Sequence, residues 1–477
     1  MRRIFLVTLA FLLGACASSG APIDPLALDR ASFERGLEKR FQYGPPLPEP
    51  AEVADAAEGQ AADAAYFAAF LDYDRSYPPQ AKVEARQLME RLRAQARSLT
   101  HEQFVLRVAE IAALADNAHT SISEDALRKN TPRLPLRTYW FPDGLHVLRA
   151  GDGQADLLGA RIDAIDGRTV EEVYQGVRRY AGGADNRRRL RLIPMLESPA
   201  LLAAAGLARE PGALTLSGVR LDGTRFERRI VAEARDRSAP VSSTTRLLFP
   251  AAPKGIENLT SLIAPDAQVP VYLREPLRLF TMAPLLGEGL YIAIGFNNDA
   301  DEGRISEFLA NALARIASDK PRFVVVDFRM NGGGDYTRTY PFMPALLEVA
   351  GPKTRIYGLI SGWTFSAAIT TVAALKQFGG KRVVLVGEPV GDRLDFWAEG
   401  RRFALPNAFL SVSYSTARHN YQAPCADPDN CFWLNYAYPV KVDSLDPEIR
   451  APLTFAAYRE LRDPAVDAVI SRESALR

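Results

Sequence analysis

Cysteine and histidine are scarce in this chain, which has 3 cysteines and 4 histidines among 477 residues. There is no His-Glu-x-x-His segment, and this disfavours a zinc hydrolase of that type. There is no Gly-x-Ser-x-Gly segment, and no lysine follows a serine by three residues, so two further kinds of serine hydrolase are excluded. With a net charge of +1 and no basic stripe, nothing indicates a nucleic-acid partner. Heptads and internal repeats are absent as well.

The N-terminus combines two arginines with an apolar run over residues 4–13. This run is shorter than the roughly 20 residues that span a bilayer, so it predicts a secretion signal over residues 1–15. The following Leu-Gly-Ala-Cys segment resembles the lipobox of bacterial lipoproteins, which implies an exported protein that is lipid-anchored to the cell envelope through Cys16. Because Ala17 and not an aspartate follows, the resemblance favours the outer membrane, facing the periplasm. The alternatives are a plain signal peptide cut near Ala17, or a short membrane anchor.

The other two cysteines, Cys425 and Cys431, are separated by a short segment that contains Pro428. Export would place them in an oxidising compartment, so we expect them to form a local disulfide. A metal site is the alternative, but it requires further ligands, and only His419 lies near in the sequence.

With 47% hydrophobic residues, the chain is long enough for two to four domains. Residues 16–30 are small and include proline, which is typical of a tether that follows a lipidated N-terminus. Residues 31–128 predict a helical domain. Within it, Thr100 and Gln103 form a candidate capping box, and the residues that follow carry apolar side chains at helical spacing, namely Phe104, Val108, Ile111 and Ala115.

Residues 132–235 predict a β-rich module of short strands and turns. Its segment 157–173 resembles the strand, turn and helix of PDZ-like modules, which hold the C-terminus of a partner along a sheet edge. The alternative is a module that only packs against its neighbours. Asp222-Gly223 predicts a hairpin turn. Residues 236–284 are irregular and are interpreted as a connector.

From residue 285 to residue 477, strands and helices alternate. The alternation predicts a parallel or mixed sheet that is covered by helices, and therefore an α/β fold class for the whole multi-domain chain. The expected strands cover residues 290–296, 323–328, 355–360 and 382–386, and the expected helices cover residues 305–316 and 366–378.

The strongest local signal is the apolar strand that ends at Asp327 and leads into Gly332, Gly333 and Gly334. Glycines at such a place allow backbone N–H groups to face a ligand, although one or two of them would also suit a tight turn. About thirty residues later, Ser366 lies where a strand meets a helix. A serine at this place is most often an ordinary N-cap.

Taken together, these segments resemble the C-terminal-processing and tricorn-core serine peptidases, which have a ClpP/crotonase-like fold. The resemblance rests on the Asp-x-Arg-x-Asn-x-Gly-Gly pattern at 327–334, on Thr-Phe-Ser-Ala-Ala at 364–368 and on Val-Gly-Glu at 386–388. Similar closing segments lie at 403–407 and 453–464. The resemblance implies that residues 285–477 are a serine peptidase catalytic domain that acts on peptides or proteins without a metal or cofactor.

In one branch of these peptidases a lysine follows the nucleophile, but residues 387–393 contain none. In tricorn-like members the base is a histidine from the end of the helical region, and the matching residue here is His119. The resemblance therefore implies Ser366 as nucleophile and His119 as general base. The oxyanion would be bound by backbone amides, and the candidates are those of Gly333, Gly334 and Ala367.

Two positions depart from the tricorn-like pattern. The serine that precedes the histidine is replaced by Ala118, and no acidic residue clearly matches the one that orients the base. An imidazole that is not oriented loses much of its value as a base. Four acidic residues are candidates for this role: Asp427, Asp429, Glu388 and Glu399.

Two functions therefore remain open at this stage. The first is an envelope serine endopeptidase that hydrolyses peptide bonds through an acyl-enzyme on Ser366. The second is a catalytically weak or inactive protein with the same fold that binds peptides or other ligands, because a fold alone does not decide function.

Overall fold

The computed structural model describes residues 48–234, 244–251, 256–275, 278–423, 427, 429–432 and 434–476. The predicted signal peptide, Cys16, the tether and Cys425 lie outside these residues. Within the described ranges, no helix is both long enough and apolar enough to cross a membrane.

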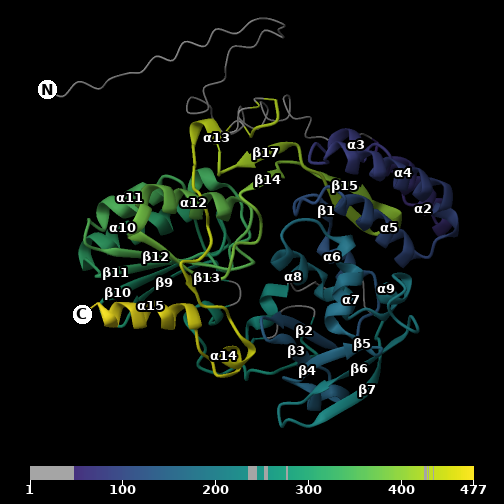
Figure 1. The fold of residues 1–477 in the computed structure, drawn as a ribbon, viewed down its shortest axis with the longest axis horizontal. Helices are drawn as coiled ribbons and strands as arrows, with labels where there is room; N and C mark the ends of the chain where they lie inside the picture. The colour runs from purple at the N-terminus through teal and green to yellow at the C-terminus, as the bar shows by residue number, and fades with distance from the viewer. Residues whose placement is uncertain are drawn as a thin grey trace, which may run out of the picture.

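The described part of the N-terminal region, from residue 48 onward, is formed by helices α2 to α6 (Figure 1). The predicted capping box is confirmed at the start of α5, where the side chains of Thr100 and Gln103 each bond the backbone of the other residue. The apolar face of α5 is buried, as its spacing predicts. The bounds are α2 Ala56–Phe67, α3 Phe70–Tyr73, α4 Pro79–Gln95, α5 His101–Ala113 and α6 Glu124–Lys129.

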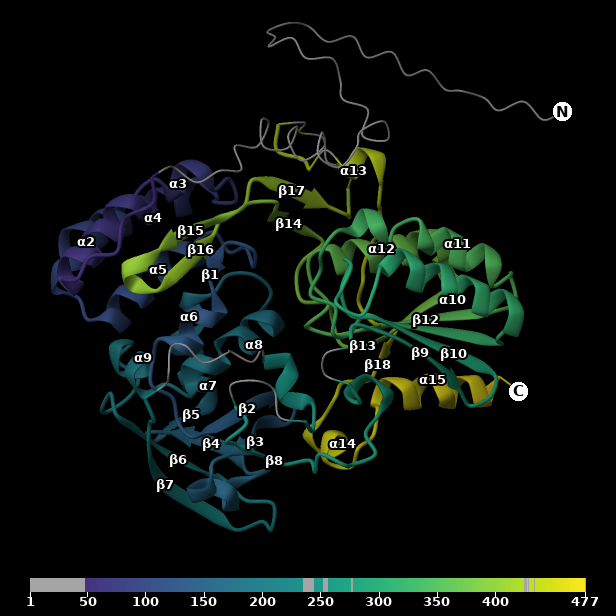
Figure 2. The same ribbon diagram turned by 180° about the vertical axis from the view of Figure 1, so that it is seen from behind.

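A hairpin from the C-terminal half of the chain completes this helical region. Strands β15 (Arg402–Leu405) and β16 (Leu410–Ser413) pair with each other, and β16 pairs with β1 (Ser121–Ile122). In both views the hairpin lies beside the N-terminal helices (Figures 1 and 2). Phe403 and Tyr414 are buried in the same core as the helices. The chain between 285 and 477 therefore contributes to two regions of the fold, which its local pattern did not indicate.

The module after the helices is an antiparallel sheet in the order β2-β3-β4-β6-β7, with β5 paired to β4 and β8 to β3. The predicted hairpin at Asp222-Gly223 joins β6 to β7, with Gly223 at φ +82°. The strands are β2 Leu136–Phe141, β3 Gly144–Ala150, β4 Arg161–Ile165, β5 Arg168–Thr169, β6 Ala213–Val219, β7 Arg225–Val231 and β8 Thr260–Ser261. Three helices accompany them: α7 Val170–Val177, α8 Asp185–Leu196 and α9 Pro199–Ala204.

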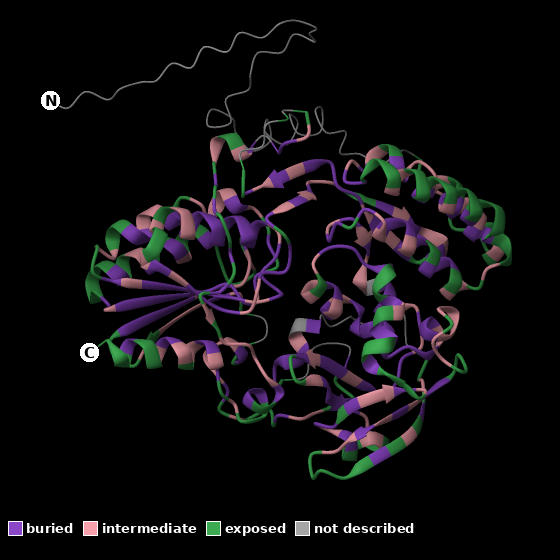
Figure 3. Ribbon diagram, in the orientation of Figure 1, coloured by how far each residue is buried: buried purple, intermediate pink, exposed green. Residues whose placement is uncertain are grey.

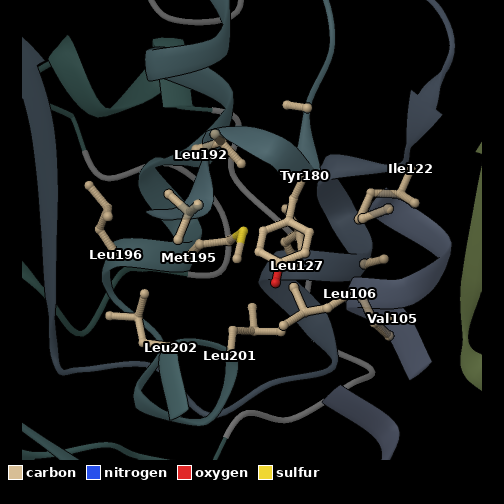
Figure 4. Close-up of a cluster of buried hydrophobic side chains, with 14 of the residues drawn as sticks. Val105, Leu106, Ile122, Leu127, Tyr180, Leu192, Met195, Leu196, Leu201 and Leu202 are labelled. Atoms are coloured by element: carbon tan, nitrogen blue, oxygen red, sulfur yellow. The ribbon is translucent and has the colours of Figure 1, made fainter. Parts of the chain in front are cut away.

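Helix α8 packs against both α7 and β2. It also joins the module to the N-terminal helices, because Leu192, Met195 and Leu196 of α8 enter the core that contains Val105 and Leu106 of α5. Figure 4 shows these side chains directed toward one another. The N-terminal helices and the module therefore share one hydrophobic core, and apolar burial of this kind resists movement of either part relative to the other.

The remaining sheet has six strands in the order β18-β13-β12-β11-β10-β9, and all neighbouring pairs are parallel except β9 with β10. The predicted strands and helices of this region are all present. The strands are β9 Phe280–Leu285, β10 Gly289–Ile294, β11 Phe323–Asp327, β12 Arg355–Ile360, β13 Val383–Gly387 and β18 Ile449–Arg450.

Helices cover both faces of this sheet (Figure 1). One face packs against α10 (Ile305–Asp319), α11 (Phe342–Val349) and α12 (Ala367–Gly379), and the other packs against α15 (Pro464–Ala475). All five residues of β11 are buried, as the purple strands of Figure 3 show. Two short helices and a pair of strands complete the described part of this half. The helices are α13 Leu434–Ala437 and α14 Phe455–Arg459, and the antiparallel pair is β14 Asp395–Ala398 with β17 Ala417–Asn420.

Candidate active site

Ser366 lies immediately before α12, with φ +57° and ψ −129°. This backbone conformation is costly for a residue with a Cβ, and such strain persists only where the surrounding structure enforces it. The side chain of Ser366 makes no capping hydrogen bond with α12, so the interpretation as an ordinary N-cap is wrong. The residue is partly exposed, and its hydroxyl is therefore available for another role.

The strained backbone is held by hydrogen bonds to the segment that follows β11. Phe365 donates its N–H to the carbonyl of Asn331 at 3.0 Å. The hydroxyl of Thr364 donates to the carbonyl of Phe328 at 2.9 Å. The hydroxyl of Ser361 donates to the carbonyl of Arg329 at 2.7 Å. The carboxyl ends of the neighbouring parallel strands β11 and β12 thus bring the two predicted segments together.

The glycine segment lies directly against Ser366. A Cβ placed on Gly333 would lie 2.7 Å from the Cβ of Ser366, so only glycine fits at this position. The predicted oxyanion donors differ in their present bonding. The N–H of Gly333 donates to Oδ1 of Asn331 at 2.9 Å. Within the part of the chain that the structure describes, no acceptor is bonded to the amide of Gly334 or to that of Ala367, the first residue of α12.

His119 lies between α5 and β1, and its ring is stacked between two phenylalanines. The centroid of its ring is 4.3 Å from that of Phe365 and 5.3 Å from that of Phe396. Phe365 directly precedes Ser366, so His119 contacts the residue next to the candidate nucleophile, but no hydrogen bond joins the imidazole to Ser366 in the described structure. Ala118, which precedes the histidine, is buried and faces Gly183.

A buried polar network fixes the backbone that carries His119. Thr120 donates its hydroxyl proton to Oδ2 of Asp74 at 2.7 Å, and the N–H of Ser415 donates to the same oxygen at 2.9 Å. Asn117 donates to the hydroxyl of Ser415 at 2.9 Å. Asp74 is fully buried, and its position at the end of α3 joins three segments that are distant in the sequence. The network therefore orients the loop from which the imidazole projects.

The acid that faces His119 is Asp392. Its Oδ2 lies 3.8 Å from Nδ1 of the imidazole, and its side chain is 2% exposed. Burial raises the pKa of Asp392 to about 7. Burial also lowers the pKa of His119 well below its usual range, and electrostatic interactions with His419, Arg191 and Arg187 lower it further. Both nitrogens of His119 and Oδ2 of Asp392 lack hydrogen-bond partners among the described residues.

None of the four acidic residues that the sequence analysis considered faces His119. Glu388 accepts a hydrogen bond from the N–H of Leu453, Glu399 pairs with His419 at 3.2 Å, and Asp427 and Asp429 are exposed. The sequence analysis did not predict Asp392, because the family resemblance directs attention to a lysine base in the segment after β13. The signal that was available is the Gly-Asp pair that follows this strand, at the place where the lysine was expected.

His419 is a second buried histidine that the sequence did not connect with the site. Its ring stacks on the opposite face of Phe396 from His119, with centroids 4.9 Å apart, and its Nδ1 lies 3.0 Å from the hydroxyl of Tyr421. It is therefore part of an aromatic and hydrogen-bonded layer behind the imidazole. The described residues contain no cluster of three or more histidine, cysteine or acidic side chains that would suit a metal ion.

Helix α8 of the module also reaches the nucleophile segment. The guanidinium of Arg187 lies 4.8 Å from the ring centroid of Trp363 and 4.6 Å from that of Phe365. Its Nε and Nη1 are buried without hydrogen-bond partners in the described structure, and burial lowers the pKa of Arg187 to about 10. The neighbouring Asn186 donates to the carbonyls of Pro389 and Val390. The module is thus in direct contact with the segments that follow β12 and β13.

Comparison with known proteins gives structural relatives only. No family model matches the sequence, and no curated protein matches it. The structure of mature CPAF with lactacystin aligns with a TM-score of 0.53 at 12% identity, covering 88% of this chain and 98% of that one. A CPAF mutant aligns with a TM-score of 0.52 at 13% identity, covering 87% and 96%. The photosystem II D1 C-terminal processing protease gives a TM-score of 0.34 at 13% identity, covering 87% and 99%.

These likenesses show the fold. The chain has the multi-domain α/β fold of CPAF-like proteases, and its predicted fold class is confirmed.

Proposed function

We propose that this protein is a serine endopeptidase that cleaves peptide bonds through an acyl-enzyme on Ser366. The observation that carries the proposal is the strained backbone of Ser366, which holds its side chain against Gly333. The preceding residue, Phe365, has the ring that stacks on His119. The CPAF-like protease fold supports it. The substrate is a peptide or protein, and the reaction uses side chains and backbone amides alone.

In this mechanism the neutral imidazole of His119 accepts the proton of the Ser366 hydroxyl while Oγ attacks the peptide carbonyl. The amides of Ala367 and Gly334 bind the oxygen of the tetrahedral intermediate, with the positive end of α12 adding to the stabilisation. His119 then gives the proton to the leaving amine nitrogen, and the C–N bond breaks. A water molecule then attacks the carbonyl of the ester while His119 accepts its proton. The ester bond breaks, which releases the carboxylate product and restores the serine hydroxyl.

Asp392 is proposed as the residue that orients the base. An ionised Asp392 would accept a hydrogen bond from Nδ1–H of His119 and stabilise the imidazolium that forms during attack. The 3.8 Å separation exceeds hydrogen-bonding distance, so the pair has to close by about 1 Å on the way to the reaction. Apo sites commonly show such loose contacts.

The proposed location is the bacterial cell envelope, with a lipid anchor on Cys16 in the outer membrane. This part of the proposal rests on the N-terminal sequence alone. The proposed disulfide between Cys425 and Cys431 rests on the same expected export. Cys431 is buried, while Cys425 lies outside the described residues, so the pairing stays a prediction.

Covalent labelling with an alkyl fluorophosphonate tests the activity directly. We expect wild-type protein to be labelled, with peptide mapping placing the label on Ser366, and the Ser366→Ala and His119→Ala variants to lose nearly all labelling. Because the two residues act as one unit, the double variant should label no more slowly than the worse single variant. Lactacystin, which is present in one CPAF structure, serves as a competitor that should reduce labelling. Label on a different serine would contradict the assignment.

A second function is a binding protein that does not hydrolyse its ligand. The observation in its favour is the absence of hydrogen-bond partners for both nitrogens of His119 among the described residues. Folded wild-type protein that binds peptides but takes no label at any pH would support this alternative.

A further inference from the structure

A cavity of about 420 Å³ lies between the module and the six-stranded sheet. On one side it is lined by residues at or beyond the carboxyl ends of three adjacent parallel strands, namely Met330, Ile360 and Gly387. On the other side it is lined by β2 and α8 of the module. The carboxyl edge of a parallel sheet is where ligands bind in many α/β proteins, and the volume is in the usual range for a ligand site, roughly 300–1,000 Å³.

The cavity is lined by residues that lead into the two segments of the proposed site, while Ser366, His119 and Gly333 do not line it. Met330 lines it and directly precedes the Asn331-Gly332-Gly333 segment that packs on Ser366. Ser361, Gly362 and Trp363 line it as well, and they lead into Ser366. A group bound in the cavity therefore contacts both the chain that carries the nucleophile and the chain that carries the oxyanion donors.

The arginines in the wall are paired with carboxylates, and Arg329 is bonded to Asp327 and Asp463. Glu388 accepts a hydrogen bond from the N–H of Leu453, and burial raises its pKa. At the α7 and α8 side, Arg189 is paired with Glu171. The rest of the lining is mainly aromatic and aliphatic, including Tyr139, Trp140, Phe141, Leu190, Trp363 and Leu453. Such a wall favours an uncharged, apolar group.

One tyrosine hydroxyl in the wall has a proton to donate. The hydroxyl of Tyr139 accepts from Nε1 of Trp363 at 2.9 Å, which leaves its own proton available. A peptide carbonyl is a suitable acceptor for this proton.

We propose that this cavity is the specificity pocket of the enzyme and that it receives a large apolar side chain, aromatic or aliphatic, of the peptide substrate. The hydroxyl of Tyr139 would bind a carbonyl oxygen of the bound peptide. The proposal rests on the function proposed above and names its substrate class. It also gives the module a role at the site, because β2 and α8 form one wall.

Binding is tested first without turnover, in the Ser366→Ala variant of the full chain. Trp140 and Trp363, two of the 4 tryptophans, line the cavity, so tryptophan fluorescence reports on its occupation. We expect a saturable change on titration with N-acetyl-phenylalanine amide or N-acetyl-leucine amide, and at most a far weaker one with N-acetyl-alanine amide or N-acetyl-glutamate amide. Equal responses to all four compounds, or no saturable response to any, would overturn the proposal.

The second test changes the size of the pocket. Leu190→Phe narrows the cavity from the α8 side, and Leu88→Phe on α4 is a matched control far from it. In the Leu190→Phe variant we expect the preference in kcat/KM for a phenylalanine peptide over its alanine counterpart to fall by roughly tenfold, and the affinity for N-acetyl-phenylalanine amide to fall in parallel. Leu88→Phe should leave both values unchanged. An unaltered preference in Leu190→Phe would contradict the pocket assignment.

The two proposals fail separately. If wild-type protein takes no fluorophosphonate label, the peptidase proposal fails, while the fluorescence titration still decides whether the cavity binds apolar side chains. If labelling on Ser366 is strong and the titration shows no fluorescence change, the peptidase proposal stands and the assignment of the cavity as the specificity pocket is wrong.

Discussion

Nδ1 of His119 lies 3.8 Å from Oδ2 of Asp392, and neither atom has a hydrogen-bond partner among the described residues. The Oδ1 of Asp392 accepts a hydrogen bond from the N–H of Arg393 at 2.9 Å, whereas its buried Oδ2 and both imidazole nitrogens have no partner in the described structure. Buried polar atoms without partners are expensive to maintain. Shifted pKa values of this kind gather at functional sites, and this pair is the main electrostatic feature of the proposed mechanism.

The pH dependence of fluorophosphonate labelling should identify Asp392 as the group that limits the rate at low pH. The pKa of His119 lies well below 6.5, so its imidazole stays neutral near pH 7, with the cations Arg187 and Arg191 on one side and His419 behind Phe396. Asp392, with its pKa at about 7, gains a proton as the pH falls through that value and ceases to stabilise the imidazolium. We expect the labelling rate of the wild type to fall with it.

The Asp392→Asn variant is the matched test of this assignment. It should label slowly, on the order of 10- to 10⁴-fold below the wild type, and its rate should no longer change near pH 7. A step near pH 7 that persists in Asp392→Asn would show that another group controls the rate.

The same carboxyl group should reduce stability at alkaline pH. The pKa of Asp392 is 3.8 in the reference state and about 7 in the fold, so the folded protein retains a proton that the unfolded chain releases between these values. Stability is therefore lost as the pH rises through that window. Asp392→Asn should be more stable than the wild type at pH 8 by roughly 2–4 kcal/mol, with no such gain at pH 4.

Thermal unfolding at the two pH values measures this difference. The substitution Asp443→Asn at an exposed position is the control, and it should leave the melting temperature nearly unchanged at both values. Equal effects of Asp392→Asn at pH 4 and pH 8 would contradict the ionisation argument.

Asp74 should be essential for both stability and labelling, although it does not contact the substrate in the proposed mechanism. Asp74→Ala leaves the buried hydroxyl of Thr120 and the N–H groups of Ser76 and Ser415 without their acceptor. We expect a loss of roughly 3 kcal/mol in the free energy of unfolding. Labelling of Ser366 should slow as well, because the loop that carries His119 loses its anchor.

The exposed Asp72 lies two residues before Asp74, and Asp72→Ala is the control. Urea denaturation of both variants, with labelling measured at a temperature where each is folded, separates the two effects. A folded Asp74→Ala variant that labels at the wild-type rate would show that the network does not position His119.

Lipidation at Cys16 is a prediction from the sequence alone. Cys16→Ser should accumulate as an unprocessed precursor and should take up no labelled palmitate in the bacterial cell, whereas Ser18→Ala should behave as the wild type. Palmitate incorporation that is unchanged in Cys16→Ser would refute the anchor.

Much of the sheet and part of the site could be predicted because their signals are local. The apolar strand that ends at Asp327, the glycines after it and the segment around Ser366 each occupy a few consecutive residues, and parallel strands bring their carboxyl ends to one edge. The capping box at Thr100 and the hairpin at Gly223 are also local patterns, and both are present.

Local patterns in the sequence thus predicted the α/β sheet, and they offered Ser366 and His119 as the candidates for nucleophile and base. Tertiary structure decided which acid faces His119, which rings enclose it, and that β15 and β16 join the N-terminal helices. The physical reason is that these contacts join residues far apart in the chain, such as His119 with Asp392 or Asp74 with Ser415. Such pairs leave no periodicity or spacing in the sequence, because the packing of whole elements brings them together and their burial then sets their charges.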